Sequence, residues 1–304
     1  MKLVFLGTPA FAVPTLERIV QAGHEVAAVF TQPDRPKGRG QKDTMPPVKE
    51  SALRLGLPVR QPERVRHPEV VEQLRTLAPE AMVVVGYGQI IPQTILDIPP
   101  LGIINVHASL LPKYRGAAPI QWAIARGETR TGVTTMKIDA GLDTGDMLLK
   151  WETEIGPEET AVELGERLAG AGADLLIETL SQLDSIRPEP QDGSQATYAP
   201  VLKKEDGRID WSMSAQEIVD RARGFLPWPG CYGFLRGQRL HVWKARAADQ
   251  SLARGALLAA GKKLFAGCNG GSIELLEVQL EGKKRMAAAA FLNGIALESG
   301  EALA

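Results

Sequence analysis

The chain has 304 residues, of which 44% are hydrophobic and 23% are charged, so it can bury one large core or two ordinary ones. This composition excludes a disordered or a fibrous protein. The 35 Lys and Arg against 36 Asp and Glu give a formal charge of −1, so any site for a polyanion has to be local.

The first stretch of the chain predicts a β-strand, a helix and a second strand. The strands cover Lys2–Leu6 and Glu25–Thr31, and the helix between them covers Pro14–Ala22. Pro14 suits a first helical turn, where its missing N–H would have had no partner, and Gly23 suits a left-handed residue behind the last turn. The chain therefore opens with a βαβ unit.

Strands and helices continue to alternate as far as residue 186. Further strands are predicted at Ala81–Val85, Ile103–Val106 and Val133–Ile138, and helices at Val48–Leu55, Pro68–Leu77, Pro119–Arg126 and Thr160–Leu180. The run Met82–Val85 is apolar on both faces, as a strand covered by helices on both sides requires. We therefore predict an α/β domain over residues 1–186, with a Rossmann-like, open and mostly parallel sheet.

The pattern changes after this domain. Residues 187–206 are poor in apolar side chains and contain Pro188 and Pro190, which predicts a linker. From residue 207 a helix at Ala215–Arg223 precedes short strands separated by glycines, at Gly230–Leu235, Arg239–Trp243, Lys263–Ala266 and Ser272–Gln279. This spacing predicts a small OB-like β-barrel domain over residues 207–304.

The small domain is mildly basic. It has 13 Lys and Arg against 9 Asp and Glu, a charge of +4, while residues 1–206 carry a charge of −5. Such an excess is typical of a solvated surface and is also compatible with nucleic-acid contact, so the count alone leaves both open.

Asn105 and His107 stand two residues apart at the end of a predicted strand, so both side chains point to one face. An amide donor and an imidazole can together hold and protonate a developing oxyanion. The carboxyl ends of strands are also where open α/β sheets bind ligands. The same pair could instead only cap the end of the strand, and this fragment does not decide between the two.

Three carboxylates follow the next strand, in the glycine-rich stretch Asp139–Asp146. Asp143 could orient His107 or accept a proton. Carboxylates in such loops also serve as turn caps, but the spacing of a calcium loop and its closing Glu are absent. We therefore expect no metal.

Four cations stand close together after the second strand. They are Arg35, Lys37, Arg39 and Lys42, in a segment that has two glycines and no hydrophobic anchor. We expect a mobile cationic loop beside the presumed active edge of the sheet, where it could reach phosphates. A solvated surface loop would show the same pattern.

The cysteines and the apolar runs indicate a reducing compartment. Cys231 and Cys268 stand far apart, with no CxxC motif and no clustered His, which argues against a disulfide scaffold and a structural zinc site. The apolar run Leu3–Leu6 ends before a signal peptide develops, and no stretch approaches the ~20 apolar residues that a membrane helix needs. We therefore expect a cytoplasmic protein with no membrane partner.

Several stretches follow one another in an order and spacing that resemble one enzyme family. In the first domain they are Gly7–Ala12, Gln32–Gly40, Val83–Gly88, Asn105–Pro112, Arg115–Ile120 and Gly141–Met147, and in the second Arg208–Trp211, Pro227–Pro229 and Val242–Ala245. Together they resemble the methionyl-tRNA formyltransferases, a branch of the folate-dependent formyltransferases, over nearly the whole chain. The motif from Asn105 to Pro112 and the later Asp143 are common to all folate-dependent members, whereas the cationic loop and the second domain resemble the tRNA-specific ones.

The resemblance implies that residues 1–186 form a catalytic domain and residues 207–304 a tRNA-binding domain. The reaction would move a formyl group from the co-substrate 10-formyltetrahydrofolate to the amino group of methionine on initiator methionyl-tRNA, without a metal. Asn105, His107 and Asp143 would be catalytic. The folate-binding residues would be Ser109, Leu110, Leu111, Pro112, Gly86, Tyr87, Gly88, Gln89 and Ile90, and the tRNA-binding residues Arg35, Lys37, Arg39 and Lys42.

Two other functions stay open. One is a folate-dependent formyltransferase or hydrolase that acts on a small molecule such as a sugar nucleotide, and it would be favoured if activity survived deletion of residues 207–304. The other is a non-enzymatic RNA-binding protein. A pure binding module has no use for Asn105, His107 and Asp143 side by side, which favours an enzyme.

Overall fold

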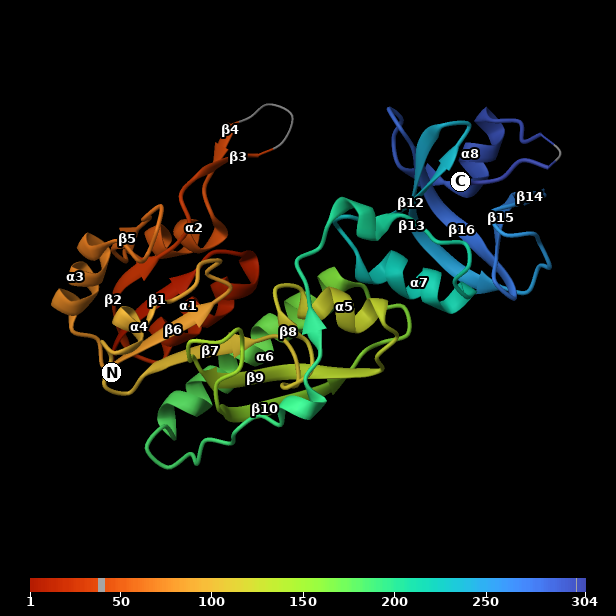
Figure 1. Cartoon of the computed structure of the whole chain (residues 1–304). Helices are drawn as coiled ribbons and strands as arrows, with labels where there is room; N and C mark the ends of the chain where they lie inside the picture. Colours follow the sequence, from red (N-terminus) through yellow and green to blue (C-terminus); the bar gives the residue numbers. More distant parts are fainter. Residues whose placement is uncertain (38–41, 299) are drawn as a thin grey trace. The chain divides into compact units, whose positions relative to one another are not determined.

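The computed structural model describes residues 1–37, 42–298 and 300–304 (Figure 1). The chain folds into two compact units. The first unit comprises Met1–Ala117, Thr131–Thr153 and Gly165–Ala199, and the second comprises Ala118–Arg130, Glu154–Leu164 and Pro200–Ala304. The domain boundaries at residues 186 and 206 stay a prediction.

A seven-stranded sheet forms the centre of the first unit, in the order β10-β9-β7-β6-β1-β2-β5. Its strands are β1 (Lys2–Gly7), β2 (Glu25–Phe30), β5 (Val59–Arg60), β6 (Ala81–Val85), β7 (Ile103–His107), β9 (Arg130–Lys137) and β10 (Met147–Glu154). The five neighbouring strands β5, β2, β1, β6 and β7 run parallel to one another, and β9 runs antiparallel to β7. The predicted Rossmann-like, mostly parallel sheet is thereby confirmed.

Helices cover this sheet. They are α1 (Val13–Gln21), α2 (Pro47–Arg54), α3 (Pro68–Leu77), α4 (Gln93–Leu96) and α6 (Ala161–Ser181), with a short 3-10 turn η1 (Ala10–Ala12) before α1. Val4 and Leu6 of β1 share a buried cluster with Leu74 of α3 and Ile95 of α4, so these two helices cover one face. As predicted, a proline stands in the first turn of α1, and Gly23 lies behind its last turn with φ +79°.

A second, smaller sheet organises the second unit. Its strands are β12 (Cys231–Leu235), β13 (Gln238–Ala248), β14 (Leu257–Ala260), β15 (Lys263–Cys268), β16 (Gly271–Leu280) and β17 (Met286–Ala287), and its helices are α5 (Pro119–Ala125), α7 (Ala215–Gly224) and α8 (Ala288–Gly294). All strand pairs are antiparallel, in the order β12-β13-β16-β15-β14, with β17 beside β16. The predicted small β domain with a preceding helix is thus confirmed.

Local chemistry explains the bounds of these elements. Ser214 caps α7, because its hydroxyl accepts from the Glu217 N–H while the Glu217 carboxylate accepts from the Ser214 N–H. Strand β13 extends beyond the predicted Trp243, since irregular pairing between Val242 and Ala245 lets it continue along β16.

Cys231 and Cys268 are both buried free thiols, and burial raises the pKa of Cys231 to about 12.

Two short strand pairs complete the first unit. The hairpin of β3 (Arg35–Lys37) and β4 (Lys42–Thr44) follows β2, and β8 (Arg115–Gly116) pairs in parallel with β11 (Tyr198–Ala199). Glu189 and Met147 exchange two backbone hydrogen bonds of 2.8 and 2.9 Å. Part of the stretch predicted as a linker therefore packs as an element of the first unit. The remaining 3-10 turns are η2 (Gly193–Gln195) and η3 (Lys204–Gly207).

None of the helices within the described ranges has both the length and the apolar character that crossing a membrane requires.

Two glycines of α6 face different surroundings. A methyl group at Gly172 would lie 2.9 Å from Val106 Cγ1 of β7 and 3.3 Å from Val133 Cγ1 of β9, whereas one at Gly170 would meet open space. Gly172 therefore lets α6 approach the strand that ends in Asn105 and His107.

We expect Gly172→Ala to lower the free energy of unfolding by about 1–3 kcal/mol, because the added methyl overpacks the helix against β7. Gly170→Ala is the matched control on the same helix and should raise that free energy by up to ~1 kcal/mol, since Ala loses less chain entropy on folding. Urea unfolding of both variants measures the difference. Equal effects would contradict a tight approach of α6 to β7.

Candidate active site

Asn105 and His107 lie where the sequence places them, at the carboxyl end of β7 and on one face of the sheet. Their exposed fractions are 8% and 6%, so both polar side chains are buried. Asn105 pairs with Val84 of β6 on one side and with Met136 of β9 on the other. Two ordered neighbouring strands therefore fix the direction in which these side chains point.

Asp143 reaches the same place from the turn between β9 and β10. Its Oδ2 atom accepts a 2.8 Å hydrogen bond from the Gly116 N–H and lies 3.7 Å from His107 Nδ1. Its Oδ1 atom lies 3.5 Å from Asn105 Nδ2, at the outer limit of a hydrogen bond. The three side chains predicted to be catalytic are thus brought together from two separate segments.

A backbone carbonyl orients the ring of His107. Its Nε2 atom lies 2.9 Å from the carbonyl oxygen of Tyr114. A carbonyl only accepts, so Nε2 has to carry the hydrogen, and Nδ1 is the nitrogen that faces the Asp143 carboxylate. His107 can therefore exchange a proton through Nδ1 while Nε2 stays occupied.

This arrangement supplies complementary groups within one small volume. The Asn105 amide is a donor, His107 Nδ1 either accepts or donates depending on its proton, and Asp143 is an acceptor. Such a set can stabilise an oxyanion and move a proton beside it.

The turn Ser109–Pro112, predicted to bind folate, directly follows β7. The Ser109 hydroxyl donates 2.6 Å to the Lys113 carbonyl, and Thr134 of β9 joins the two ends of the turn by donating to the Ser109 carbonyl and accepting from the Leu111 N–H. Ser109 and Leu111 are 1% exposed, and the Leu111–Pro112 peptide bond is cis. Leu110 and Pro112 are partly exposed.

The second predicted folate segment, Gly86–Ile90, follows β6 at the same edge of the sheet. Gly86 and Gly88 have φ of +57° and +82°, which lets the chain turn tightly. Gln89 is engaged with the backbone, because its Oε1 atom accepts 2.7 Å from the Val65 N–H. Ile90, by contrast, is 87% exposed.

Tyr87 in this segment points into the protein. It is 1% exposed and belongs to the cluster beneath α3 and α4, and burial raises the pKa of its hydroxyl well above the ordinary value. Its carbonyl oxygen accepts from Thr8 Oγ1 and Gln32 Nε2, each at 3.1 Å. If Tyr87 contacts a ligand, it therefore does so through its backbone and not through its buried side chain.

The cationic segment begins at the same edge as a hairpin rather than as an irregular loop. Arg35 lies 3.6 Å from Glu63, and both side chains are largely exposed. Backbone pairing joins Lys37 and Lys42, whereas their side chains, and Arg39 altogether, lie outside the described residues. The predicted tRNA contacts of these four cations stay a prediction.

Asp34 holds the base of this hairpin. Its carboxylate accepts 2.6 Å from Lys49 Nζ and 2.7 Å from Gln61 Nε2. The hydrogen bond from Lys49, followed by that from Gln61, lowers the pKa of Asp34. The segment is therefore held by polar contacts at its base, although it has no hydrophobic anchor.

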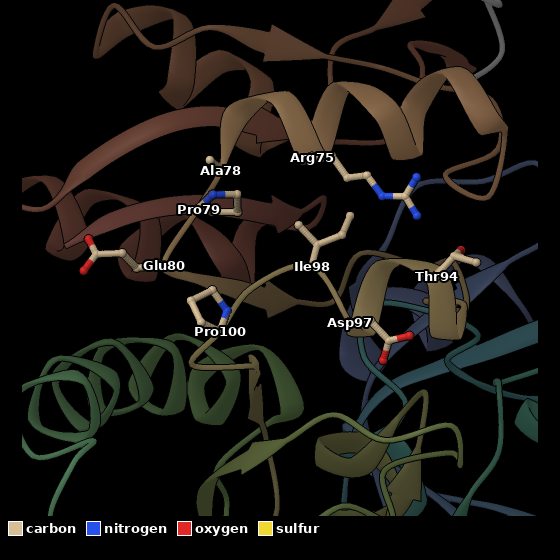
Figure 2. A pocket seen from close by; sticks show the side chains of 8 residues that line it. All are labelled: Arg75, Ala78, Pro79, Glu80, Thr94, Asp97, Ile98 and Pro100. Atoms are coloured by element: carbon tan, nitrogen blue, oxygen red, sulfur yellow. The ribbon is translucent and has the colours of Figure 1, made fainter.

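A pocket in the first unit lies at the opposite edge of the sheet. Figure 2 shows its lining, formed by Arg75, Ala78, Pro79, Glu80, Thr94, Asp97, Ile98 and Pro100. Glu80 directly precedes β6, and Pro100 comes shortly before β7. The pocket therefore borders the amino ends of these strands, away from the end that carries His107.

Sequence reasoning missed the groups that hold the catalytic candidates. Tyr114, Gly116 and Thr134 act through backbone atoms or a hydroxyl, which leave no motif of their own. Arg115 and Gln191 hydrogen-bond to each other, at 2.9 and 2.8 Å, and Gln191 lay in the predicted linker. A polar residue within a Pro-rich stretch gives little signal of a tertiary contact.

Among the residues that the structure describes, no group of three or more His, Cys, Asp or Glu is placed to hold a metal ion.

Two family models match the chain. One, described as formyl transferase, matches residues 1–180, and the other, described as formyl transferase, C-terminal domain, matches residues 201–296. The methionyl-tRNA formyltransferases of Solibacter usitatus and Koribacter versatilis are 65% and 58% identical to this chain, over all of it and 98% of each relative. The N-formyltransferase from Helicobacter canadensis, solved with folinic acid and dTDP-3-aminofucose, has a TM-score of 0.67 at 19% identity, over 90% of this chain and 98% of that one. This last likeness shows the fold alone.

Proposed function

The chain belongs to the formyl transferase family, and on this premise we propose that it transfers a formyl group from 10-formyltetrahydrofolate to the amino group of initiator methionyl-tRNA. The observation that carries the proposal is the meeting of the Asn105 amide, the His107 ring and the Asp143 carboxylate at the carboxyl end of β7. The high identity to methionyl-tRNA formyltransferases over the whole chain supports the choice of acceptor.

The chemistry follows from these three side chains. The free amine of methionine attacks the formyl carbon, and the carbonyl oxygen becomes an oxyanion in the tetrahedral intermediate. Asn105 Nδ2 and a protonated His107 Nδ1 donate hydrogen bonds to this oxygen. Asp143 stabilises the charged ring, accepts the proton that the attacking nitrogen loses and passes it to N10 of the folate as the bond between the formyl carbon and N10 breaks.

The folate would lie between two segments at the carboxyl edge of the sheet. The partly exposed Leu110 and Pro112 offer apolar surface on one side, and the backbone of Gly86–Ile90 offers polar groups on the other. A pocket of apolar walls with a few fixed polar groups is typical for a ligand of this kind. The reaction needs no metal in this scheme, and the proposal places the protein in the cytoplasm.

Incubating the purified protein with 10-formyltetrahydrofolate and Met-charged initiator tRNA tests donor and acceptor together. Parallel reactions contain uncharged tRNA, glycinamide ribonucleotide or an amino-sugar nucleotide. We expect formylation of the charged tRNA alone. Transfer to a small acceptor instead would favour the small-molecule formyltransferase, and tRNA binding without transfer would favour a binding protein.

In the same assay we expect Asn105→Ala and His107→Ala each to lower single-turnover transfer by about 100-fold or more, because loss of one oxyanion donor costs ~2.7–4 kcal/mol. His67→Ala, at an exposed residue before α3, is the matched control and should keep full activity. Near-normal transfer by a folded Asn105 or His107 variant would remove that residue from the mechanism.

The cationic segment gives a separate prediction about the acceptor. Each phosphate contact releases condensed counterions, so replacing Arg39 and Lys42 by Ala should weaken tRNA binding and flatten its salt dependence by roughly one unit of log–log slope per lost contact. Folate binding should not change. Replacing Lys2 and Arg75 by Ala removes the same charge near the opposite edge of the sheet and should leave the slope intact. Unchanged slopes in both variants would make the segment an ordinary solvated surface.

A further inference from the structure

We propose that Gln191 is a positioning residue for the carboxylate of Asp143, and this inference rests on the proposed formyl transfer. The side-chain hydrogen bonds that the structure gives Gln191 join it to Arg115 and to two backbone carbonyls, not to the carboxylate of Asp143. Gln191 acts instead on the backbone of the turn that carries Asp143, and it connects this turn to the segment that carries Gly116.

The turn around Asp143 needs external support. Asp143 has φ +52°, in the left-handed region that non-glycine residues avoid, at a cost of order 1 kcal/mol. Asp139 holds the beginning of the turn, because its carboxylate accepts from the Gly141 N–H and from the Thr144 hydroxyl. These contacts do not involve the carbonyl group of Asp143.

Gln191 provides the missing restraint. Its Nε2 atom donates to the carbonyl oxygen of Asp143 at 2.9 Å and to that of Gly145 at 2.8 Å. One amide nitrogen therefore bridges two backbone carbonyls, one on each side of Thr144. With both carbonyls held, the Asp143 backbone keeps the conformation that directs its side chain toward His107.

Arg115 fixes the orientation of the Gln191 amide. Its Nε and Nη2 atoms donate to Gln191 Oε1 at 2.9 and 2.8 Å. Because a guanidinium only donates and a carbonyl only accepts, the amide has one orientation that satisfies all four bonds. The two hydrogens of Nε2 are therefore directed at the turn.

The same segment also holds the Asp143 side chain. The residue after Arg115 is Gly116, whose N–H donates 2.8 Å to Asp143 Oδ2. Strand β8, formed by these two residues, is itself bound by the chain that follows Gln191, since the N–H of Arg115 donates to the Thr197 carbonyl. One connected set of hydrogen bonds therefore holds Asp143 at its backbone carbonyl and at its carboxylate.

Gln191→Ala removes the two donors, so the turn can relax and the carboxylate can leave His107. Because a misplacement of about 1 Å can cost ~10²-fold in rate, we expect kcat to fall about 10- to 100-fold. KM for the folate and for the tRNA should stay unchanged, since only an interaction used in the transition state is lost. Gln191→Glu keeps the length and the Arg115 contact but places a charged acceptor oxygen against the carbonyls of Asp143 and Gly145, so kcat should fall by at least a similar factor.

A double-mutant cycle distinguishes positioning from general damage. If Gln191 acts only through the Asp143 carboxylate, Gln191→Ala should lower single-turnover transfer no further in an Asp143→Asn background. Gln195→Ala is the matched control, because this amide lies in the same stretch and donates to Asp192. It should retain wild-type kcat.

The wild-type reaction separates this inference from the proposed function. If the wild-type protein transfers no formyl group, the proposed function fails before any variant is compared. If it does, an unchanged kcat in Gln191→Ala overturns the positioning role, and so does a full additional loss in the Asp143→Asn background. A loss shared by Gln195→Ala would likewise point to damage of the whole stretch.

Discussion

The geometry of the candidate site depends on holding Asp143 in the left-handed region of backbone space. In that conformation its carboxylate lies 3.7 Å from His107 Nδ1 and accepts from the Gly116 N–H. The ring that it faces is oriented by the Tyr114 carbonyl, which accepts from the other nitrogen. Both restraints come from residues 114–116, so one short segment sets the distance between the imidazole and the carboxylate.

Much of the fold was predictable because its signals are local. Strand β6 and helix α3 have the predicted bounds, since a doubly buried strand and a Pro-started amphipathic helix each carry a distinct pattern. Strand β10 (Met147–Glu154) was missed although its last six residues alternate half-buried and exposed side chains, a period of two that is typical of a strand. The hairpin β3–β4 was missed because the residues before it are held by the ion pair between Asp34 and the distant Lys49 rather than by apolar side chains.

The site divides in the same way between local and long-range information. Asn105 and His107 stand out because two polar residues at i and i+2 end an apolar strand. Gln191 shows no such pattern, since its amide meets Asp143 across 48 residues of sequence. Sequence reasoning therefore found the groups proposed to perform the chemistry and missed those that support them.

The most direct test of this account is the single-turnover rate of Asp143→Asn, measured together with its affinity for methionyl-tRNA. The amide keeps the shape of the side chain and an oxygen that can accept from Gly116, but it cannot take up a proton or stabilise a charged imidazole. The account predicts a loss of transfer of about 10²-fold or more with tRNA affinity retained. Near-normal transfer, or equal losses in rate and affinity, would contradict it.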